Sequence, residues 1–446
     1  MFEPLYTAAE MQAAEEGHDV EVLMERAGSE VARLILEDYE DVEGITVVCG
    51  PGNNGGDGRV AARVLAEAGK GVLVVDSKPD HEEKDLGEPE LVVDALFGTG
   101  FSGEPRPAAA QLIEQINELE AEVVAIDIAS GVDASTGEVA GAAVDAWQTI
   151  ALHGEKVGNY VAPGSFFAGA VDVVDIGLEH RATEHARVLH EIVQEVPRRA
   201  PGDTKYSAGS VLVVGGSPGM TGAVCLTAEA AFRADAGYVA VAAPRESLPV
   251  IETRLLEAVK RPLEDVWQAA ERAGALAIGP GLGRDQGELV RRLLAETDLP
   301  AVVDADALFE LEPFERAAPT VLTPHSGELG RLLGEDSSWV DAHRLEALRR
   351  AVDRYRCVVV LKGEGTLVGA LGERPLVAGG AAALATAGTG DVLTGVIAAF
   401  LSKGMEGRLA AAAGVRAHTD AVFESGRWSG LVASDLLDAL PRVLDA

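Results

Sequence analysis

The sequence is poor in aromatic residues and in lysine. Aromatic side chains make up 4% of the 446 residues, and there are 8 lysines against 29 arginines. With 72 acidic and 37 basic side chains, the formal net charge is −35. Such a surface repels phosphate groups, which excludes a general nucleic-acid-binding protein. Many carboxylates with little lysine favour a halophilic protein over an ordinary acidic one, because concentrated salt screens the self-repulsion.

Cysteines and long apolar runs are scarce as well. The cysteines Cys49, Cys225 and Cys357 lie far apart in the sequence, which excludes a disulfide framework and a zinc site. No apolar run reaches the ~18 residues of a transmembrane helix. Residues 1–4 show no basic stretch that leads into an apolar core. We therefore expect no secretory signal, no membrane partner and a cytoplasmic location.

Glycine and short apolar runs are abundant. The chain has 51 glycines and is 47% hydrophobic, which is typical of layered α/β proteins with many tight loops. Helices are expected within 11–39 and over 59–68, the second ended by Gly69, where a positive φ is needed. Continuous apolar strands between helices indicate a parallel sheet covered on both faces. The strands expected here are 45–49, 72–75, 91–93, 123–126 and 170–174.

A second alternating series follows a break in the pattern. Around 191–204 periodicity is lost and proline and glycine punctuate the sequence, so we place a domain boundary there. The sequence predicts two α/β domains, over residues 1–195 and 200–446, with an Ala-rich helical stretch from about 392 to 444. The strands expected in the second domain are 210–214, 238–242, 276–278, 301–303, 321–322 and 358–361.

The segment 50–58, GPGNNGGDG, follows an expected strand and opens a helix. Glycines let a backbone approach a ligand closely, and free N–H groups at a helix start attract phosphate. The segment matches neither the dinucleotide fingerprint nor the P-loop. Its amide and carboxylate oxygens could also hold a cation, and a plain turn is the alternative.

Two further strands end in polar side chains. DALFGTGFSG begins at Asp94, and DIASGVD begins at Asp127 and contains Ser130. Because ligands bind at the carboxyl ends of strands in open α/β sheets, we expect Asn54 to meet these residues at one edge. For a single aspartate, a helix-cap or turn role is the alternative, and the convergence of three loops argues against it.

With LMERAG at 23–28, these motifs make residues 1 to about 190 similar to the NAD(P)H-hydrate epimerase family, which has a Rossmann-like three-layer fold. The resemblance implies a potassium ion on Asn54, Asp94 and Ser130, with Asp127 as the acid or base. A departure is Ala129, where the family usually has proline; no side-chain ligand is lost by it. The residues implied to bind the hydrated nucleotide are Asn53, Asn54, Gly55, Gly56, Asp57, Gly98, Thr99, Gly100, Phe101, Ser102, Gly103, Glu104 and Asp127.

The second half carries AGTGDVLTG at 387–395. Gly388 and Gly390 leave backbone N–H groups free at a helix start, which makes an anion hole for a transferring phosphoryl group. Asp391 follows and can take a proton from a hydroxyl, the one base that phosphoryl transfer requires. A glycine turn with an aspartate cap is the alternative.

Four more motifs each follow an expected strand: LAIGPGLGR, VDADAL, LTPHSG and LKGEGT. Lys362 in the last suits contact with a phosphate or nucleotide, with a solvated lysine as the alternative. His325 suits ligand contact better than a place in the core, whereas His153 has no such context and is taken as structural.

With KYSAGSVLVVGGSPGMTGA at 205–223, residues 200–446 resemble the ADP-dependent NAD(P)H-hydrate dehydratase family, whose fold is ribokinase-like. Two departures are Ser326, where the family often has proline, and the Gly-Gly-Ala at 379–381, where it often has Asn-x-Gly. The residues implied to contact the hydrated nucleotide are Ala223, Gly281, His325 and Asp391. Those implied to contact the adenine nucleotide are Lys362, Gly363, Glu364, Gly365, Thr366 and Gly390.

Together the resemblances imply a homo-oligomeric enzyme that repairs NADHX and NADPHX, the hydrated forms of NADH and NADPH. The first half would interconvert the R and S hydrates, and the second would dehydrate the S hydrate with ADP and release AMP and phosphate. Asp391 would assist attack of the hydroxyl of the hydrate on the β-phosphate. Mg²⁺ is expected because both substrates bring polyphosphates. The preference for NADH or NADPH and for ADP or ATP stays open.

Three other hypotheses are weighed. A ribokinase-type small-molecule kinase with an accessory nucleotide-binding domain would share the GTGD segment but does not need NNGGDG. A non-enzymatic nucleotide-binding or protein-interaction module is disfavoured because Asp127 and Asp391 are intact. A dehydrogenase needs G-x-G-x-x-G and an acidic residue about 20 positions on. Asp76 stands 18 residues after Gly58, but the loop does not match.

Overall fold

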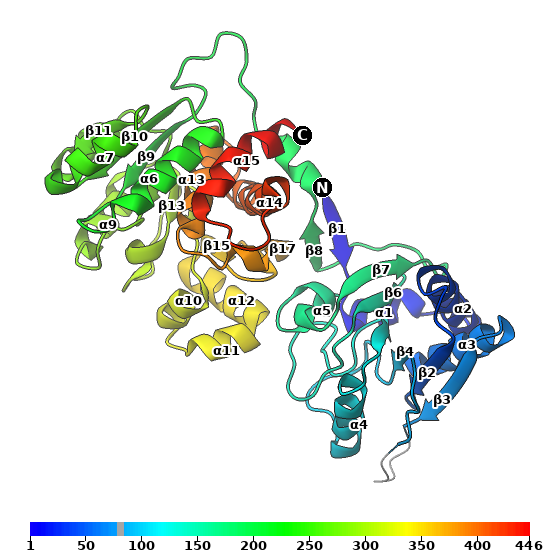
Figure 1. Cartoon of the computed structure of the whole chain (residues 1–446). Coiled ribbons are helices and arrows are strands. Elements are labelled where there is room, and N and C mark those ends of the chain that lie inside the picture. The colour runs from blue at the N-terminus through cyan, green and yellow to red at the C-terminus, as the bar shows by residue number, and fades with distance from the viewer. Residues whose placement is uncertain (78–83) are drawn as a thin grey trace. The chain divides into compact units, whose positions relative to one another are not determined.

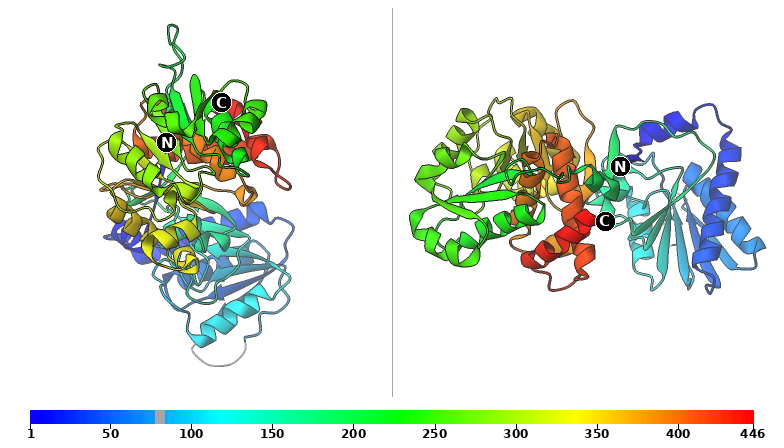
Figure 2. Two further views of the ribbon diagram at one scale, coloured as in Figure 1. Left: turned by 90° about the vertical axis from the view of Figure 1, so that its left-hand side faces the viewer. Right: turned by 90° about the horizontal axis from the view of Figure 1, so that it is seen from above.

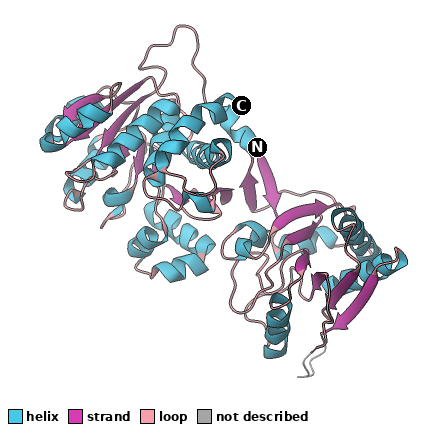
Figure 3. Ribbon diagram, in the orientation of Figure 1, coloured by secondary structure: helices cyan, strands magenta, loops and turns pink. Residues whose placement is uncertain are grey.

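The computed structural model describes residues 1–77 and 84–446. The chain divides into two compact units: the N-terminal unit is Pro4–Ala186, and the C-terminal unit is Arg187–Ala446 together with Met1–Glu3 (Figure 1). Both units consist of strands flanked by helices (Figure 3). Within the described residues no helix is long and apolar enough to cross a membrane.

The N-terminal unit contains a sheet in the order β3-β2-β4-β5-β6-β7, parallel throughout its described pairs. Its strands are β2 (Gly44–Cys49), β3 (Gly71–Asp76), β4 (Leu91–Ala95), β5 (Glu122–Ile126), β6 (Gln148–Leu152) and β7 (Ala170–Val174). Its helices are α1 (Ala8–Glu15), α2 (Val20–Asp38), α3 (Asn53–Glu67), α4 (Pro107–Asn117) and the short α5 (Val157–Tyr160).

Alternate residues of β2 belong to two hydrophobic cores, one on each face of the sheet. Val47 of β2 packs with Ala27 of α2 and Leu65 of α3 on one face of the sheet. Val48 packs with Ile113 of α4 on the other. Because successive side chains of a strand point to opposite faces, both faces of this sheet are buried, which explains its continuous apolar strands. The α/β class predicted from the sequence is confirmed.

Two details of this unit differ from the sequence-based expectation. The strand β6 lies in a segment for which no strand is predicted. The helix α3 begins at Asn53, so Asn53 to Asp57 form its first turns rather than a loop, although glycine disfavours helices. Gly69 does follow this helix with φ 97°, the positive value that the sequence predicts.

The C-terminal unit contains a sheet in the order β1-β8-β17-β16-β15-β14-β13-β12-β9-β10-β11. It is parallel from β11 to β15 and antiparallel between β15, β16 and β17. The strands are β1 (Phe2–Leu5), β8 (His185–Val188), β9 (Ser210–Val214), β10 (Tyr238–Ala243), β11 (Val259–Pro262), β12 (Ala275–Ile278), β13 (Ala301–Val303), β14 (Thr320–Leu322), β15 (Val358–Leu361), β16 (Thr366–Gly369) and β17 (Leu376–Gly379).

The longer helices of this unit are α6 (Thr221–Arg233), α7 (Leu248–Arg254), α9 (Gly287–Glu296), α10 (Ser326–Leu333), α12 (Arg344–Tyr355), α13 (Thr389–Ser402), α14 (Gly407–Ser425) and α15 (Ala433–Asp445). The helix α13 is buried along most of its length, between α6, α14 and the sheet (Figure 2). A Cβ on Gly395 would lie 2.2 Å from the carbonyl oxygen of Thr227 in α6, so only glycine permits this close packing.

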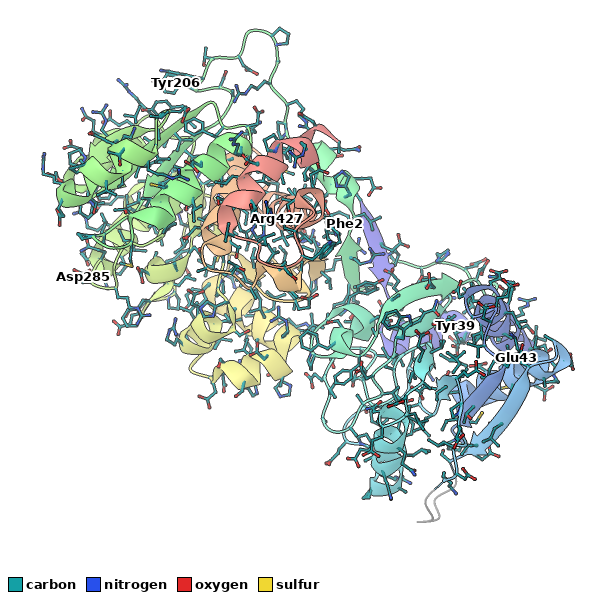
Figure 4. All side chains as sticks on the ribbon, viewed as in Figure 1. Phe2, Tyr39, Glu43, Tyr206, Asp285 and Arg427 are labelled. Atoms are coloured by element: carbon teal, nitrogen blue, oxygen red, sulfur yellow. The ribbon has the colours of Figure 1, made fainter. Side chains whose placement is uncertain are left out.

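Aromatic contacts hold the segment that precedes β9. Tyr206 lies in this segment (Figure 4). The centroids of the Tyr206 and Tyr238 rings are 5.0 Å apart, and the Lys205 ammonium is 5.3 Å from the centroid of the Tyr206 ring. Cation–π contacts of this kind contribute roughly 0.5–1 kcal/mol at exposed sites. They fix the chain that leads into the first strand of the parallel part of the sheet.

Candidate functional site

The N-terminal unit has a topological switch point at β2, where strand order reverses between β3 and β4. In open α/β sheets such a point, at the carboxyl ends of the strands, is where ligands bind. The segments that leave β2 and β4 meet there: the Gly50 N–H donates to the Ala95 carbonyl at 2.9 Å. A Cβ on Gly50 would lie 1.9 Å from the carbonyl oxygen of Leu96, so only glycine fits.

The start of α3 lies at this switch point. Gly52 occupies its N-cap position and provides no side-chain cap, which leaves the first N–H groups available to an anion. A Cβ on Gly55 would lie 1.9 Å from the Gly50 carbonyl oxygen, so the helix packs directly on the preceding turn. The glycine-rich sequence thus brings a helix start, and not a flexible loop, to the edge of the sheet.

Asn54 connects three segments of the site. Its Nδ2 donates to the carbonyl oxygens of Phe97 at 2.7 Å and Ile126 at 3.2 Å. A Cβ on Gly98 would lie 3.0 Å from the Asn54 Cβ, so the second glycine-rich loop packs on this side chain. Asn54 Oδ1 is buried and has no hydrogen-bond partner in the described part of the chain.

Asp94 and Ser130 form a buried pair that is joined to Asn54 through Phe97, whose N–H donates to Ser130 Oγ at 2.8 Å. Asp94 Oδ1 accepts from Ser130 Oγ at 2.7 Å, and Oδ2 accepts from the Ser130 N–H at 2.8 Å. Burial raises the Asp94 pKa to about 6 although these bonds lower it. The orphaned Asn54 oxygen, the Asp94 carboxylate and the Ser130 hydroxyl, which are linked through the Phe97 backbone, form an all-oxygen donor set that fits a hard cation. The described residues contain no group of three or more His, Cys, Asp or Glu side chains that could hold a metal.

Asp127 follows β5 in the left-handed region, with φ 73°, an uncommon conformation for a residue other than glycine. Its Oδ1 accepts the Leu152 N–H at 3.0 Å and forms an ion pair with Lys156. The Lys156 ammonium is fully buried and also donates to the carbonyl oxygens of Leu152 at 2.6 Å and Gly154 at 2.9 Å. Several hydrogen bonds thus hold Asp127 in its strained backbone conformation.

Two more carboxyl groups lie near Asp127. Burial, then the charges of Asp127 and Glu15, raise the pKa of Asp57 to about 8. Burial and the Asp127 charge likewise raise the pKa of Glu15, which Lys156 lowers in part. His153 is buried, stacks on His180 with 4.8 Å between ring centroids, and its burial lowers its pKa to about 4. Its structural assignment stays a prediction.

The second glycine-rich loop, residues 98–104, is more exposed than the start of α3. Phe101 stacks on Phe97 with ring centroids 4.6 Å apart, and Gly103 has φ 77°. The structure therefore brings Asn54 into contact with Gly98 and Asp94 into contact with Ser130, and the Phe97 backbone joins the two pairs. The other predicted members of this loop form an exposed or half-exposed turn: Thr99, Gly100, Ser102 and Glu104.

The C-terminal unit has its own switch point at β9, between β10 and β12. The segment after β12 packs there on the start of α6, since a Cβ on Gly281 would lie 3.4 Å from the Ala223 Cβ. The Ser217 N–H donates to the Gly281 carbonyl at 2.7 Å. The predicted pair Ala223 and Gly281 is thus adjacent at this edge.

The GTGD segment opens α13, as the sequence predicts. Gly388 occupies the N-cap position with φ 93° and gives no side-chain cap. A Cβ on Gly390 would lie 3.4 Å from Lys362 Nζ and 3.9 Å from Asp304 Oδ2. The helix start and the Lys362 ammonium therefore meet, which provides N–H groups and a positive charge for an anion.

Asp304 holds Lys362 in this position. Lys362 Nζ is 2.8 Å from Asp304 Oδ1 and 3.8 Å from Glu328 Oε2, while Thr394 Oγ1 donates to Asp304 Oδ2 at 2.8 Å. Burial lowers the Lys362 pKa, but the surrounding carboxylates outweigh it and raise the pKa overall. Burial, then the Asp304 charge, raise the pKa of Asp391 to about 7.

His325 is the N-cap residue of α10. Its Nδ1 accepts the Gly327 N–H at 3.0 Å, and the backbone N–H of His325 donates to Glu328 Oε2 at 2.9 Å. Its side chain is 57% exposed, so it is not a core histidine. The rest of the ring is available to a ligand while Nδ1 caps the helix.

The predicted nucleotide loop, 362–366, leads from β15 into β16, with Thr366 as the first residue of β16. A Cβ on Gly380 would lie 2.8 Å from the Gly363 carbonyl oxygen, so the Gly-Gly pair after β17 packs on this loop. Beneath it, Arg344 Nη2 donates to the carbonyl oxygens of Leu361 at 3.2 Å and Lys362 at 3.3 Å. Gly365 and the exposed Glu364 complete the loop.

The sequence-based analysis did not single out Lys156, Asp304, Glu328 or Arg344. Asp304 lies in the quoted VDADAL motif at a strand end, a signal that could have identified it. Lys156 has no motif of its own. Its role depends on burial against the chain reversal after β6, which only the folded structure brings about.

Comparison with known proteins gives matches to both units. Residues 211–442 match the family model described as NAD(P)H-hydrate dehydratase. Residues 20–87 and 72–158 match the model described as the YjeF-related protein N-terminus. These two matches follow the order of the two units along the chain.

Full-length relatives carry one description. The chain is 37% identical to the bifunctional NAD(P)H-hydrate repair enzyme Nnr of Moorella thermoacetica, over 95% of this chain and 92% of the relative. It is 36% identical to the protein of that name from Salinibacter ruber, over 99% of this chain and 96% of the relative. The crystal structure of an ADP/ATP-dependent NAD(P)H-hydrate dehydratase from Bacillus subtilis, co-crystallized with ATP/Mg²⁺, matches 58% of this chain and 96% of that chain, with TM-score 0.53 and 30% identity.

Proposed function

The chain belongs to the family of bifunctional NAD(P)H-hydrate repair enzymes, and from that premise we propose how its residues divide the work. It is both an NAD(P)H-hydrate epimerase and an NAD(P)H-hydrate dehydratase. We assign the first activity, on the R and S hydrates, to a domain over residues 1–195. The second, the ADP-dependent dehydration of the S hydrate, belongs to a domain over 200–446.

The observation that carries the dehydratase assignment is the contact between Lys362, Asp304 and the start of α13. A phosphoryl group at Gly390 would accept N–H groups of the helix start and lie beside a fixed ammonium. Asp391 stands one residue further on this helix. Phosphoryl transfer requires a protein to position the phosphate and to supply one base, and this site offers both.

The proposed reaction conserves atoms as follows. Asp391 takes the proton of the ring hydroxyl while that oxygen attacks the β-phosphorus of ADP, and the bond to the α-phosphate oxygen breaks to release AMP. The phosphorylated hydroxyl then leaves as inorganic phosphate, and the adjacent ring carbon loses a proton, which restores NADH or NADPH. The hydrated nucleotide would contact Ala223, Gly281 and His325, and the adenine nucleotide the loop 362–366.

Two cations are proposed. Mg²⁺ would neutralise phosphate charge, since it is usually held by one or two carboxylates together with substrate phosphates, and Glu328 beside Lys362 offers such a carboxylate. A potassium ion would be held by Asn54, Asp94 and Ser130, which the orphaned Asn54 oxygen supports. It would supply a fixed positive charge next to the bound nucleotide, whose phosphates would lie at the start of α3.

The epimerase site is proposed at the switch point of the N-terminal unit. The nucleotide would bind along Asn53–Asp57 and 98–104, with its phosphates at the uncapped start of α3. Asp127 would act as acid or base on the hydrated ring carbon. The chain is proposed to form a homo-oligomer, which light scattering would test.

An absorbance assay tests this assignment. Mixed NADH hydrates are offered with Mg²⁺ and ADP, ATP or no nucleotide, and the return of NADH is followed. We expect complete recovery with ADP and none without a nucleotide, and Asp391→Asn should abolish it. Failure with both nucleotides would overturn the dehydratase assignment and favour a ribokinase-type kinase.

A further inference from the structure

The two oxygens of Asp127 have different surroundings. Oδ1 accepts the Leu152 N–H at 3.0 Å and is ion-paired with Lys156, whereas no hydrogen bond reaches Oδ2 from any described residue. The Lys156 ammonium has three acceptors and 0% exposure. Lys156 therefore cannot reach a substrate, and it acts only on the orientation and charge of Asp127.

Asp57 is a second carboxylic acid on the same edge of the sheet. It lies three residues after Asn54 in α3, so both side chains share a face of the helix. The Asn54 amide donates to the carbonyl of Ile126, the residue before Asp127, which fixes this face above the end of β5. Asp57 is 7% exposed, and no described residue forms a hydrogen bond or ion pair with its side chain.

The two acids experience opposite electrostatic environments. The groups that act on Asp57 are the carboxylates Asp127 and Glu15, and with burial they raise its pKa to about 8. The nearby end of α2 contributes Met24, while Glu25 is paired with Arg63. Asp127 instead faces the Lys156 ammonium, with the neutral His153 beyond it. Two acids whose environments differ in this way divide into a proton donor and a proton acceptor.

We propose that Asp57 and Asp127 are the acid–base pair of the epimerase site: Asp57 donates a proton to the leaving hydroxyl, Asp127 accepts one from the entering water, and Lys156 is the positioning residue that holds the Asp127 carboxylate in place. This proposal rests on the epimerase function proposed above. It assigns separate roles to two acids where the sequence indicates a single one.

The proposed step conserves atoms and charge. The hydroxyl leaves its ring carbon as water after it receives the Asp57 proton, and the lone pair of the adjacent ring nitrogen forms a C=N⁺ bond. A water molecule then adds to the opposite face of that carbon and gives its extra proton to Asp127. Solvent returns this proton to Asp57, so that only the configuration of the carbon has changed.

The pH dependence of epimerisation tests the proposal. The intact chain is given the pure R hydrate without ADP, and the S hydrate is followed by NMR. Wild type should give a rate that falls above about pH 8, where Asp57 loses its proton. Asp57→Asn should lower the rate roughly 100-fold and remove the alkaline fall. Lys156→Met should lower kcat and leave KM nearly unchanged, because Asp127 loses the contact that orients it.

Glu15→Gln is the matched control, because it removes a neighbouring carboxylate without touching the pair. It should keep the alkaline fall and move it to lower pH, since the Glu15 charge raises the Asp57 pKa. Thermal unfolding followed by circular dichroism reports in each variant that the N-terminal unit is folded. Lys156→Arg keeps the positive charge and should restore much of the wild-type kcat.

Three results would overturn the proposal. If Asp57→Asn kept the wild-type rate and the alkaline fall, Asp57 would not be the proton donor. An unchanged kcat in Lys156→Met would leave Lys156 without a positioning role, and if that variant unfolds, a folded Lys156→Arg without measurable epimerisation would do the same. No epimerisation by wild type would instead refute the epimerase function itself, so the two failures are distinguishable.

Discussion

The Lys362 ammonium donates to Asp304 Oδ1 at 2.8 Å, and this pair lies against Gly390 at the start of α13. Asp304 is 2% exposed, so the pair has lost most of its hydration. Buried ion pairs contribute little net stability because desolvation offsets their attraction. The pair instead fixes a cation beside a helix start that would bind a phosphoryl group. Its role is therefore functional.

Lys362→Met should therefore destabilise the C-terminal unit and abolish dehydration. Asp304 would remain buried with the Thr394 hydroxyl but without its cation, which costs about 3 kcal/mol. Urea unfolding monitored on the intact chain measures this loss. Lys362→Met with Asp304→Asn should recover stability but not activity. A stable, active single variant would contradict the role assigned to the pair.

The rate of dehydration should rise with pH through about 7, because Asp391 must be ionised to accept a proton and its pKa is raised to about 7. Below that pH the carboxyl is protonated and cannot act as a base. Asp391→Asn should lower kcat by roughly 10⁴, which leaves no detectable return of NADH and no such pH dependence. Asp306→Asn, which removes one of the charges that raise this pKa, should move the limb to lower pH. A flat wild-type profile would exclude Asp391 as the base.

Gly55→Ala should destroy epimerisation and leave dehydration intact. The added Cβ would lie 1.9 Å from the Gly50 carbonyl oxygen, so the start of α3 must move, at a cost of about 1–3 kcal/mol. Gly52→Ala is the control in the same segment, because a Cβ there meets nothing within 4 Å. Equal epimerisation rates in the two variants would show that the close packing is unimportant.

Salt should stabilise the protein. A formal charge of −35 repels itself, and at about 1 M salt the screening length falls to roughly 3 Å. We expect Tm to rise by several degrees between dilute buffer and about 1 M KCl, and sucrose serves as the uncharged control. A Tm that is unchanged or falls in salt would contradict the halophilic interpretation.

Much of the framework could be predicted from the sequence, because buried parallel strands are continuous apolar runs that end in polar, glycine-rich segments. The expected strands 45–49, 123–126 and 358–361 are present within a residue of their predicted ends. The contact between Asp94 and Ser130, and that of Asn54 with the end of β5, follow from their positions after three strands of one parallel sheet, whereas a shared site for the three residues stays a prediction.

The rest depends on tertiary contacts that leave no local pattern. Nothing around Lys156 indicates that its ammonium is enclosed by backbone carbonyls and Asp127. Asn53–Asp57 is helical because Gly55 permits close packing on Gly50, whereas intrinsic propensity argues for a loop. The antiparallel strands β16 and β17 are short and flanked by glycines, which conceals them in the sequence.

The most direct test of the account is to offer the pure R hydrate of NADH to the intact chain with ADP, Mg²⁺ and potassium, and to follow the return of NADH. Wild type should recover all of it, Asp127→Asn should recover it only as fast as the R hydrate epimerises unaided, and Asp391→Asn should recover none. Recovery by Asp127→Asn at the wild-type rate would contradict two activities that act in sequence, and so would recovery by Asp391→Asn.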